Sequence, residues 1–244
     1  MFPWSILSQP WRAVAGLVSV VLTATVCGDI CCVPDQFEAN LIYDNANVFI
    51  DANTAYSYTN STAQAAYDYT NNKTYVKLVS VELSPLIPQP VRSEYTILTD
   101  YVKGVQYQFT DTHCEKSSVG SMQKPCIPDN AIKVNSGFFG NNQTKVVTFQ
   151  FTPAGTTLNY LATIDPTICM PVVEVFVAGD VVPDSGSINS VLVSDVTPGI
   201  KDPTIFDPPK ICLTKSSRRD KAVSPHLKRL RRNIMTTFPF HTKH

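Results

Sequence analysis

Segments in which polar and apolar side chains alternate recur along most of this chain, and this period of two restricts its fold more than any other feature. Successive side chains of a β-strand point to opposite faces, so the alternation predicts half-buried strands. Clusters of Gly, Pro, Asn and Asp separate the segments, as expected for turns. The clearest predicted strands are 74–83, 94–99, 105–110, 145–152, 157–164, 172–177 and 187–195, with shorter ones at 40–43, 48–52, 55–59 and 65–70.

The predicted strands combine into an all-β fold. Many gaps between them are short enough for hairpins, so neighbouring strands are expected to run antiparallel, as in a sandwich or barrel. The apolar sets expected to face inward are Val105, Tyr107 and Phe109; Val147, Phe149 and Phe151; and Leu158, Tyr160, Ala162 and Ile164. In 172–177 only Glu174 is polar. This indicates either a strand covered on both faces or one whose carboxylate is solvated.

The first 28 residues differ from the rest and are predicted to form a signal peptide. Arg12 is the only charged residue before Asp29, and residues 13–27 form a weakly polar to apolar run. That run is shorter than the roughly 20 apolar residues of a membrane span. We expect cleavage near Gly28, with a position a few residues earlier as the alternative, and a soluble mature chain that is lumenal or extracellular.

Cysteines and glycosylation sequons agree with a secretory route. Cys27 leaves with the predicted signal, and six cysteines remain, an even number that allows three disulfides. Their spacing does not match a zinc site. Sequons predict N-glycosylation at Asn60, Asn72 and Asn142.

The net charge of zero combines an acidic body with a basic tail. From residue 213 onward there are nine Lys or Arg and one Asp, whereas residues 1–212 hold 11 basic and 19 acidic side chains. We expect 29–212 to form the folded domain and 213–244 a disordered tail. Arg229, Arg231 and Arg232 form a paired-basic pattern typical of convertase cleavage after Arg232; a merely solvated tail is the alternative. A secreted chain gives the tail no access to nucleic acid.

Motifs of an enzyme are missing from the sequence. His113 is the only histidine of the predicted body and adjoins Cys114, which we expect to be oxidised. Neither a metalloprotease motif, a nucleophile elbow nor a phosphate loop occurs. A carboxylate pair for glycoside hydrolysis stays open, but nothing singles out two residues. We predict a protein that is not an enzyme.

Residues 198–212, PGIKDPTIFDPPKIC, predict a shaped loop. Proline lacks an N–H and clashes with the preceding helical turn, so no helix runs across Pro203 or across Pro208 and Pro209. The segment carries the apolar pair Ile205 and Phe206 and ends at Cys212.

Four blocks resemble the ependymin-related proteins in order and spacing: CCVPDQFEA, EYTILTDYVKGVQYQFTDTHC, ATIDPTICMPVVEVF and GIKDPTIFDPPKIC. The last block is the most specific, and the resemblance spans residues 31–212. The chain departs from the family pattern at Phe37 and Ala39, and at Gln89, where a family cysteine is expected.

The resemblance implies an antiparallel two-sheet sandwich, an open half-barrel similar to bacterial lipoprotein carriers, with a deep apolar pocket between the sheets. It also implies disulfides Cys31–Cys169 and Cys114–Cys212, which leaves Cys32 and Cys126 as the third pair. The Cys114–Cys212 bridge would hold the 198–212 loop against the strand at 105–110, so that Ile205 and Phe206 plug the edge of the sandwich.

A lipid-like or fatty-acyl ligand is the partner that the resemblance implies, together with calcium as a candidate cofactor and homodimers. From the residues alone an ordinary packed core is the simpler interpretation; the resemblance favours a pocket. The candidate ligand-binding residues are Tyr95, Ile97, Tyr107, Phe109, Phe149, Phe151, Tyr160, Val175 and Val191.

Calcium ligands are not identified by the sequence. Oxygen-rich segments at 44–47, 180–184 and 202–207 lack the spacing of an EF-hand. The alternative function is an extracellular-matrix or cell-adhesion protein that acts through calcium and glycans instead of a pocket. Release of the peptide after Arg232 as a signal is compatible with either.

Overall fold

The structure is a computed structural model that describes residues 31–49, 55–85, 88–152, 158–179 and 185–214. The predicted signal peptide, the convertase pattern and the acidic segment 180–184 lie outside these ranges. The described chain is almost entirely β-structure, and its strands pair antiparallel.

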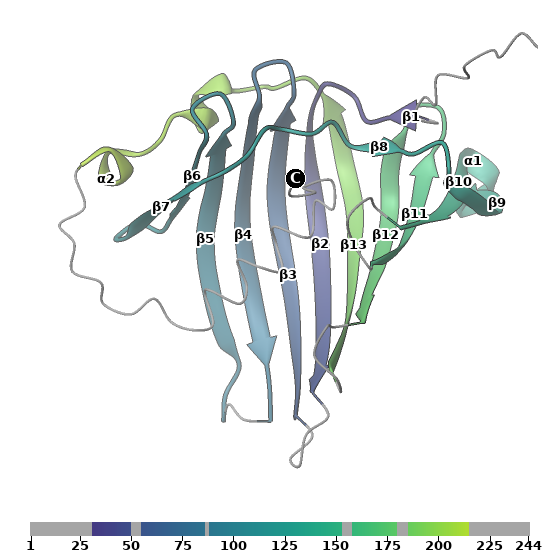
Figure 1. Ribbon diagram of the computed structural model, residues 1–244, viewed down its shortest axis with the longest axis horizontal. Coiled ribbons are helices and arrows are strands. Elements are labelled where there is room, and N and C mark those ends of the chain that lie inside the picture. The colour runs from purple at the N-terminus through teal and green to yellow at the C-terminus, as the bar shows by residue number, and fades with distance from the viewer. Residues whose placement is uncertain (1–30, 50–54, 86–87, 153–157, 180–184, 215–244) are drawn as a thin grey trace, which may run out of the picture.

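Eleven strands form one continuous sheet in the order β7-β6-β5-β4-β3-β2-β13-β12-β11-β10-β9, whose strands fan out side by side in Figure 1. A second sheet has only two strands, β1 (Cys31–Cys32) and β8 (Cys126–Ile127). The all-β antiparallel architecture expected from the strand pattern and the open form implied by the resemblance are confirmed, with two sheets of very unequal size. In the large sheet the strands are β2 (Gln36–Phe49), β3 (Ala55–Asp68), β4 (Lys73–Leu83), β5 (Val91–Asp100), β6 (Val105–Phe109), β7 (Cys114–Ser118), β9 (Ile132–Phe139), β10 (Thr144–Phe151), β11 (Asn159–Asp165), β12 (Met170–Gly179) and β13 (Ser185–Pro198).

Most predicted strands exist, but two of them are longer than the alternation indicates. The segment predicted at 40–43 and the described part of 48–52 belong to one strand, β2, and the segments at 55–59 and 65–70 belong to β3, which ends at Asp68. Each has 14 residues, and they pair along their whole length from Gln36 opposite Asp68 to Phe49 opposite Ala55. β7 and β9 were not predicted, because neither shows a regular apolar alternation.

The sheet bends into an open half-barrel whose concave face holds the main core. One cluster of buried side chains joins Val76 on β4 and Ile97 on β5 to Phe149 on β10 and Ile164 on β11. These strands lie far apart in the order of the sheet, so their side chains meet only if the sheet curves around them. The predicted inward sets on β10 and β11 belong to this cluster, apart from the half-buried Leu158.

A strap closes the top of the half-barrel; we use this name for residues 31–33 and 122–127, which contain β1 and β8. In Figure 1 the chain from β7 to β8 crosses the upper end of the sheet. Val33, Met122 and Ile127 of the strap are buried in the main core. The Val33 N–H donates to the Pro125 carbonyl at 3.0 Å, and Cys32 is bonded to Cys126.

A clasp, residues 199–213, covers part of the convex face. It contains the 3-10 turn η1 (Pro203–Phe206), the helical turn α2 (Lys210–Leu213) and buried Phe206. No helix crosses the prolines: Asp202 caps η1, with Pro203 as its first residue, and α2 begins after Pro209. Phe206 packs in a second cluster with Leu98 and Tyr107. The expectation that Ile205 and Phe206 plug the edge of a sandwich is therefore wrong, since they cover the outer side of β3 to β6.

Candidate functional site

An apolar cavity lies between the concave face of the large sheet and the strap. β2, β3 and β4 form one wall, β11, β12 and β13 the opposite wall, and Pro125, Cys126 and Ile127 of the strap contribute to the lining. Antiparallel strands place every second side chain on one face, which is why residues so far apart in sequence line one cavity.

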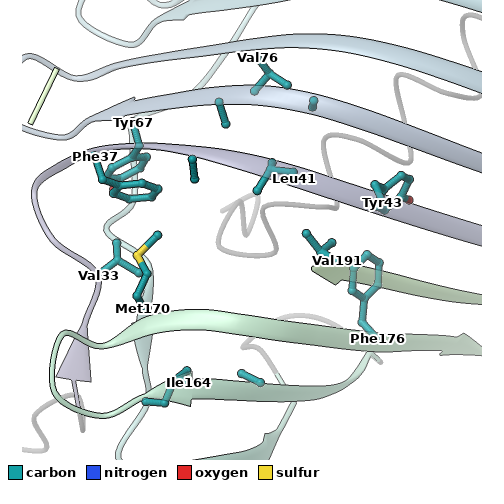
Figure 2. Packing of buried hydrophobic residues seen from close by; sticks show 14 of the residues in the cluster. Val33, Phe37, Leu41, Tyr43, Tyr67, Val76, Ile164, Met170, Phe176 and Val191 are labelled. Carbon is teal, nitrogen blue, oxygen red and sulfur yellow. The ribbon is translucent and has the colours of Figure 1, made fainter. Parts of the chain in front are cut away.

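Aliphatic and aromatic side chains make up most of the lining. Figure 2 shows Phe37, Tyr67 and Leu41 projecting from β2 and β3 toward Met170, Ile164 and Val191 on the other side. The rings of Phe37 and Tyr67 stack with centroids 5.2 Å apart. Burial raises the pKa of the Tyr67 hydroxyl, so Tyr67 stays uncharged in the physiological range.

The cavity has a volume of about 50 Å³. Pockets for small ligands usually measure about 300–1,000 Å³. The cavity therefore has room for a few water molecules, and a lipid-sized ligand requires the strap or the wall side chains to move. The pocket here is much narrower than the resemblance implies.

One carboxyl group lines this cavity. Glu174 projects from β12, opposite Ala162 on β11 and Val191 on β13, and is only 8% exposed. Burial raises the pKa of Glu174 to about 7, and its interaction with the Tyr160 hydroxyl lowers it only in part. The strand is thus covered at this position, and the solvated alternative for Glu174 is excluded.

Farther along the concave face the apolar lining gives way to a buried polar band. The Tyr43 hydroxyl donates to Asn189 Oδ1 at 2.6 Å, and Asn45 also hydrogen-bonds to Asn189. Asn47 bonds to Asn45 and reaches Ser57 Oγ at 3.4 Å. These side chains satisfy one another's hydrogen-bonding groups. They mark where the apolar lining of the concave face ends.

The predicted ligand-binding residues fall into three groups. Val191 lines the cavity. Tyr95, Ile97, Phe149, Phe151 and Tyr160 belong to the surrounding core cluster on the same face.

The other three predicted residues lie on the opposite face of the sheet. Tyr107 and Phe109 pack under the clasp, and Val175 is half-buried on the convex side of β12. The inward orientation expected for Val105, Tyr107 and Phe109 is therefore wrong, because the apolar side of β6 faces the clasp.

The cysteines form the three bridges that the resemblance implies: Cys31–Cys169, Cys32–Cys126 and Cys114–Cys212. The first ties the strap to the turn before β12, the second joins the two strands of the strap, and the third ties the clasp to β7. Two of the three bridges therefore frame the cavity.

The sequons occupy different places. Asn60 lies on the convex face within β3, where its side-chain amide donates to Asp44 Oδ1 at 2.8 Å. Asn72 lies in the turn between β3 and β4 with φ of 54°. Asn142 lies in α1 (Gly140–Gln143), between β9 and β10.

The acidic segments considered for calcium have other roles where the structure describes them. Asp44 lies within β2 and accepts hydrogen bonds from Tyr58 and Asn60. Asp202 accepts from the Thr204 N–H and hydroxyl. Within the described ranges, no three His, Cys, Asp or Glu side chains are grouped so that they could hold a metal ion. His113 is exposed, with Nε2 3.4 Å from Glu115 Oε1.

The strap residues and Glu174 were not among the predicted site residues. Val33, Pro125 and Ile127 lie in short segments without periodicity, and only the fold brings them over the sheet. Glu174 gave a signal in the sequence, because it is the one polar residue in an otherwise apolar strand.

The family model and the related sequences that match this chain agree on one protein family. A sequence model of the family Ependymin matches residues 89–212. The chain is 25% identical over 200 residues to ependymin-related protein 1 of Haliotis asinina, covering 77% of this chain and 92% of the relative. It is 29% identical over 168 residues to mammalian ependymin-related protein 1 of Rattus norvegicus, covering 66% and 70%.

Among solved structures, a LolA superfamily protein from Nitrosomonas europaea is similar over 72% of this chain and 91% of its own, with 10% identity and a TM-score of 0.31. That score is too low to support conclusions about fold or function. No helix in the described ranges has the length and hydropathy that a membrane span needs.

The matched family region covers just over half of the chain and includes β5 to β13 and the clasp. On this basis the chain belongs to the ependymin family.

Proposed function

We propose that this protein binds a lipid-like apolar ligand between the concave face of the large sheet and the strap. The observation that carries the proposal is the lining: among the described residues, Glu174 and Thr74 are its only strongly polar side chains. A site of this composition removes an acyl chain from water, and each buried CH₂ group contributes about 0.8 kcal/mol.

Ligand entry requires the closed cavity to widen. We infer that the strap moves, because it is a two-stranded ribbon that belongs to no larger sheet and is attached across the cavity mainly by Cys31–Cys169 and by a Lys124–Asp35 ion pair of 2.5 Å. We expect the disulfides to keep the strap attached while the residues between them move away from Leu41 and Val191.

A cavity-filling variant tests the location of the site. Val191→Phe adds a ring inside the cavity, whereas Val175→Phe adds the same ring on the convex face of the neighbouring strand. In a titration with a pyrene-labelled long-chain alcohol, Val191→Phe should weaken binding at least tenfold and Val175→Phe should leave it unchanged. Overpacking costs about 1–3 kcal/mol, so the melting temperature of each variant must show that it is folded. Equal binding by both variants would contradict the site.

A second candidate role is association through the convex face. Ile42, Leu192, Val177 and Ile188 are 39%, 40%, 42% and 55% exposed there, and Ile42 pairs with Leu192 while Val177 pairs with Ile188. Exposed apolar side chains on adjacent strands favour a protein contact. We propose that two copies associate through this face. Sedimentation equilibrium should give a dimer that Ile188→Asp dissociates, and a monomer for the unmodified protein would contradict it.

We further propose that the chain is secreted or lysosomal and carries N-glycans. The three bridges support an oxidising compartment. The proposal also includes calcium binding and a role in the extracellular matrix. Isothermal titration of the deglycosylated protein with CaCl₂ tests whether it binds calcium. A titration without a saturable heat signal would contradict calcium binding.

A further inference from the structure

We propose that Glu174 couples ligand binding to uptake of a proton, so that the cavity prefers uncharged lipids and binds them more tightly as the pH falls. This inference rests on the proposed lipid-binding function and adds a ligand class and a regulating ion to it.

Glu174 lies in the wall of an apolar cavity instead of at the protein surface. The side chain is 8% exposed, its strand neighbours are Ala162 and Val191, and it lines the cavity together with Ile164 and Met170. Transfer of an ionised carboxylate into such surroundings is costly unless a cation compensates it.

In the part of the chain that the structure describes, no cation compensates this carboxylate. Among the described residues, the ion pairs do not include Glu174, and the cavity lining contains no Lys, Arg or His. Among the described lining residues, buried Tyr67 on β3 is the only other group that titrates, because Cys126 and Cys169 are in disulfides.

Two further titratable side chains lie on the same face of the sheet as Glu174. Tyr160 on β11 interacts directly with Glu174, and Tyr43 on β2 lies opposite Val191. Burial and the neighbouring carboxylate raise the pKa of Tyr160, so this phenol stays a neutral donor. β13 and β8 contribute only Val191, Val193, Cys126 and Ile127 to the lining. Glu174 is thus the one group there that changes charge near neutral pH.

The raised pKa of Glu174, about 7, means that both charge states are populated in the empty protein at neutral pH. A ligand that fills the cavity removes the remaining water from the carboxyl group and so favours its neutral form. Binding therefore takes up a proton. If the ligand raises the pKa by one further unit, affinity at high pH is about tenfold lower than at low pH.

The same carboxyl group sets the preferred ligand class. When ionised, it repels an anionic head group placed against β12, whereas a hydroxyl group can hydrogen-bond to either form. An uncharged long-chain alcohol or acylglycerol fits this cavity better than an alkyl sulfate of equal chain length.

The test compares binding of a pyrene-labelled long-chain alcohol and of its sulfate ester at pH 5.5 and pH 8.5. The unmodified protein should bind the alcohol about tenfold more tightly at pH 5.5, and the sulfate more weakly than the alcohol at pH 8.5. Glu174→Gln, which mimics the protonated form, should bind the alcohol tightly at both pH values. Glu94→Gln, on the opposite face and 53% exposed at its side chain, is the matched control and should keep the tenfold change.

Proton uptake provides an independent measurement on the unmodified protein. Calorimetry in two buffers of different ionisation enthalpy should show proton uptake at pH 7.5 that disappears in Glu174→Gln. Saturable binding with no pH dependence and no proton uptake would overturn this inference while leaving lipid binding intact. Absence of binding to either probe at both pH values would overturn the proposed function and this inference together.

Discussion

Aspartates at two strand ends fix the turns that follow them. Asp68 accepts a hydrogen bond from the Asn71 N–H at 2.9 Å, and Asp100 accepts one from the Lys103 N–H at 2.9 Å. Gln36 and the Asn71 side chain also donate to Asp68. Burial raises the pKa of Asp68, but these hydrogen bonds outweigh it and the net pKa is lowered.

Replacement of Asp68 by Asn should destabilise the fold by about 1–3 kcal/mol, since hydrogen bonds to a charged acceptor are lost. A carboxyl group with a lowered pKa stabilises the fold above its unfolded pKa, and this contribution is lost as the pH falls through the folded value. Urea unfolding at pH 7 and pH 3 should show a smaller difference between variant and unmodified protein at pH 3. The exposed substitution Asp111→Asn should cost little, and an equal cost for both would contradict the assignment.

Glu174 gives the opposite pH dependence. Its folded pKa, about 7, lies above the ordinary glutamate value of 4.5, so its contribution to stability is lost as the pH rises between these values. Glu174→Gln should therefore stabilise the empty protein at pH 8 relative to pH 5, by up to about 3 kcal/mol. Urea unfolding checks this, and a pH-independent effect of the substitution would contradict burial of an ionised carboxylate.

At the scale of elements, the clasp stabilises the convex side of β3 to β6. Phe206 is 5% exposed, and the Lys73 ammonium lies 6.0 Å from the centre of its ring. Phe206→Ala should lower the free energy of unfolding by about 3–5 kcal/mol, as for other buried Phe residues. Leu213→Ala is the control, because Leu213 is 60% exposed. A loss below 1 kcal/mol for Phe206→Ala would show that the clasp does not pack as described.

The bridge from Cys114 to Cys212 holds the clasp in place across 98 residues of sequence. A loop of that length corresponds to about 4–5 kcal/mol in the chain-entropy model. The double variant Cys114→Ser/Cys212→Ser, which leaves no free thiol, should be secreted poorly and melt at a lower temperature. Normal yield with an unchanged melting temperature would contradict this role.

The alternation in the sequence identifies strands well but their faces poorly. In β5 every residue from Tyr95 to Asp100 is buried, because the concave side faces the core and the convex side is covered by the clasp. Where both faces of a strand are buried, both can carry apolar side chains, so the alternation no longer shows which face points into the main core. For that reason Tyr107 and Phe109 were placed on the wrong side, while β10 and β11, with one clear apolar face, were placed correctly.

At the scale of the whole molecule, the curvature of one large sheet creates the site. β2 and β13 lie at its centre, and β4 on one side and β11 on the other supply opposite walls. The sequence predicts the strands and marks Glu174 as unusual, and the family resemblance implies the bridges. Neither places the strap over the sheet or predicts how narrow the cavity is, because both features depend on how distant segments pack.

Native mass spectrometry of the protein expressed through the secretory pathway and treated with a glycosidase, followed by solvent extraction and lipid analysis, tests the central claim of an apolar ligand site most directly. We predict one lipid per protein, uncharged at its polar end, that is released on denaturation and is absent from folded Val191→Phe but present in Val175→Phe. A folded protein that carries no lipid and does not retain an added long-chain alcohol would contradict the account.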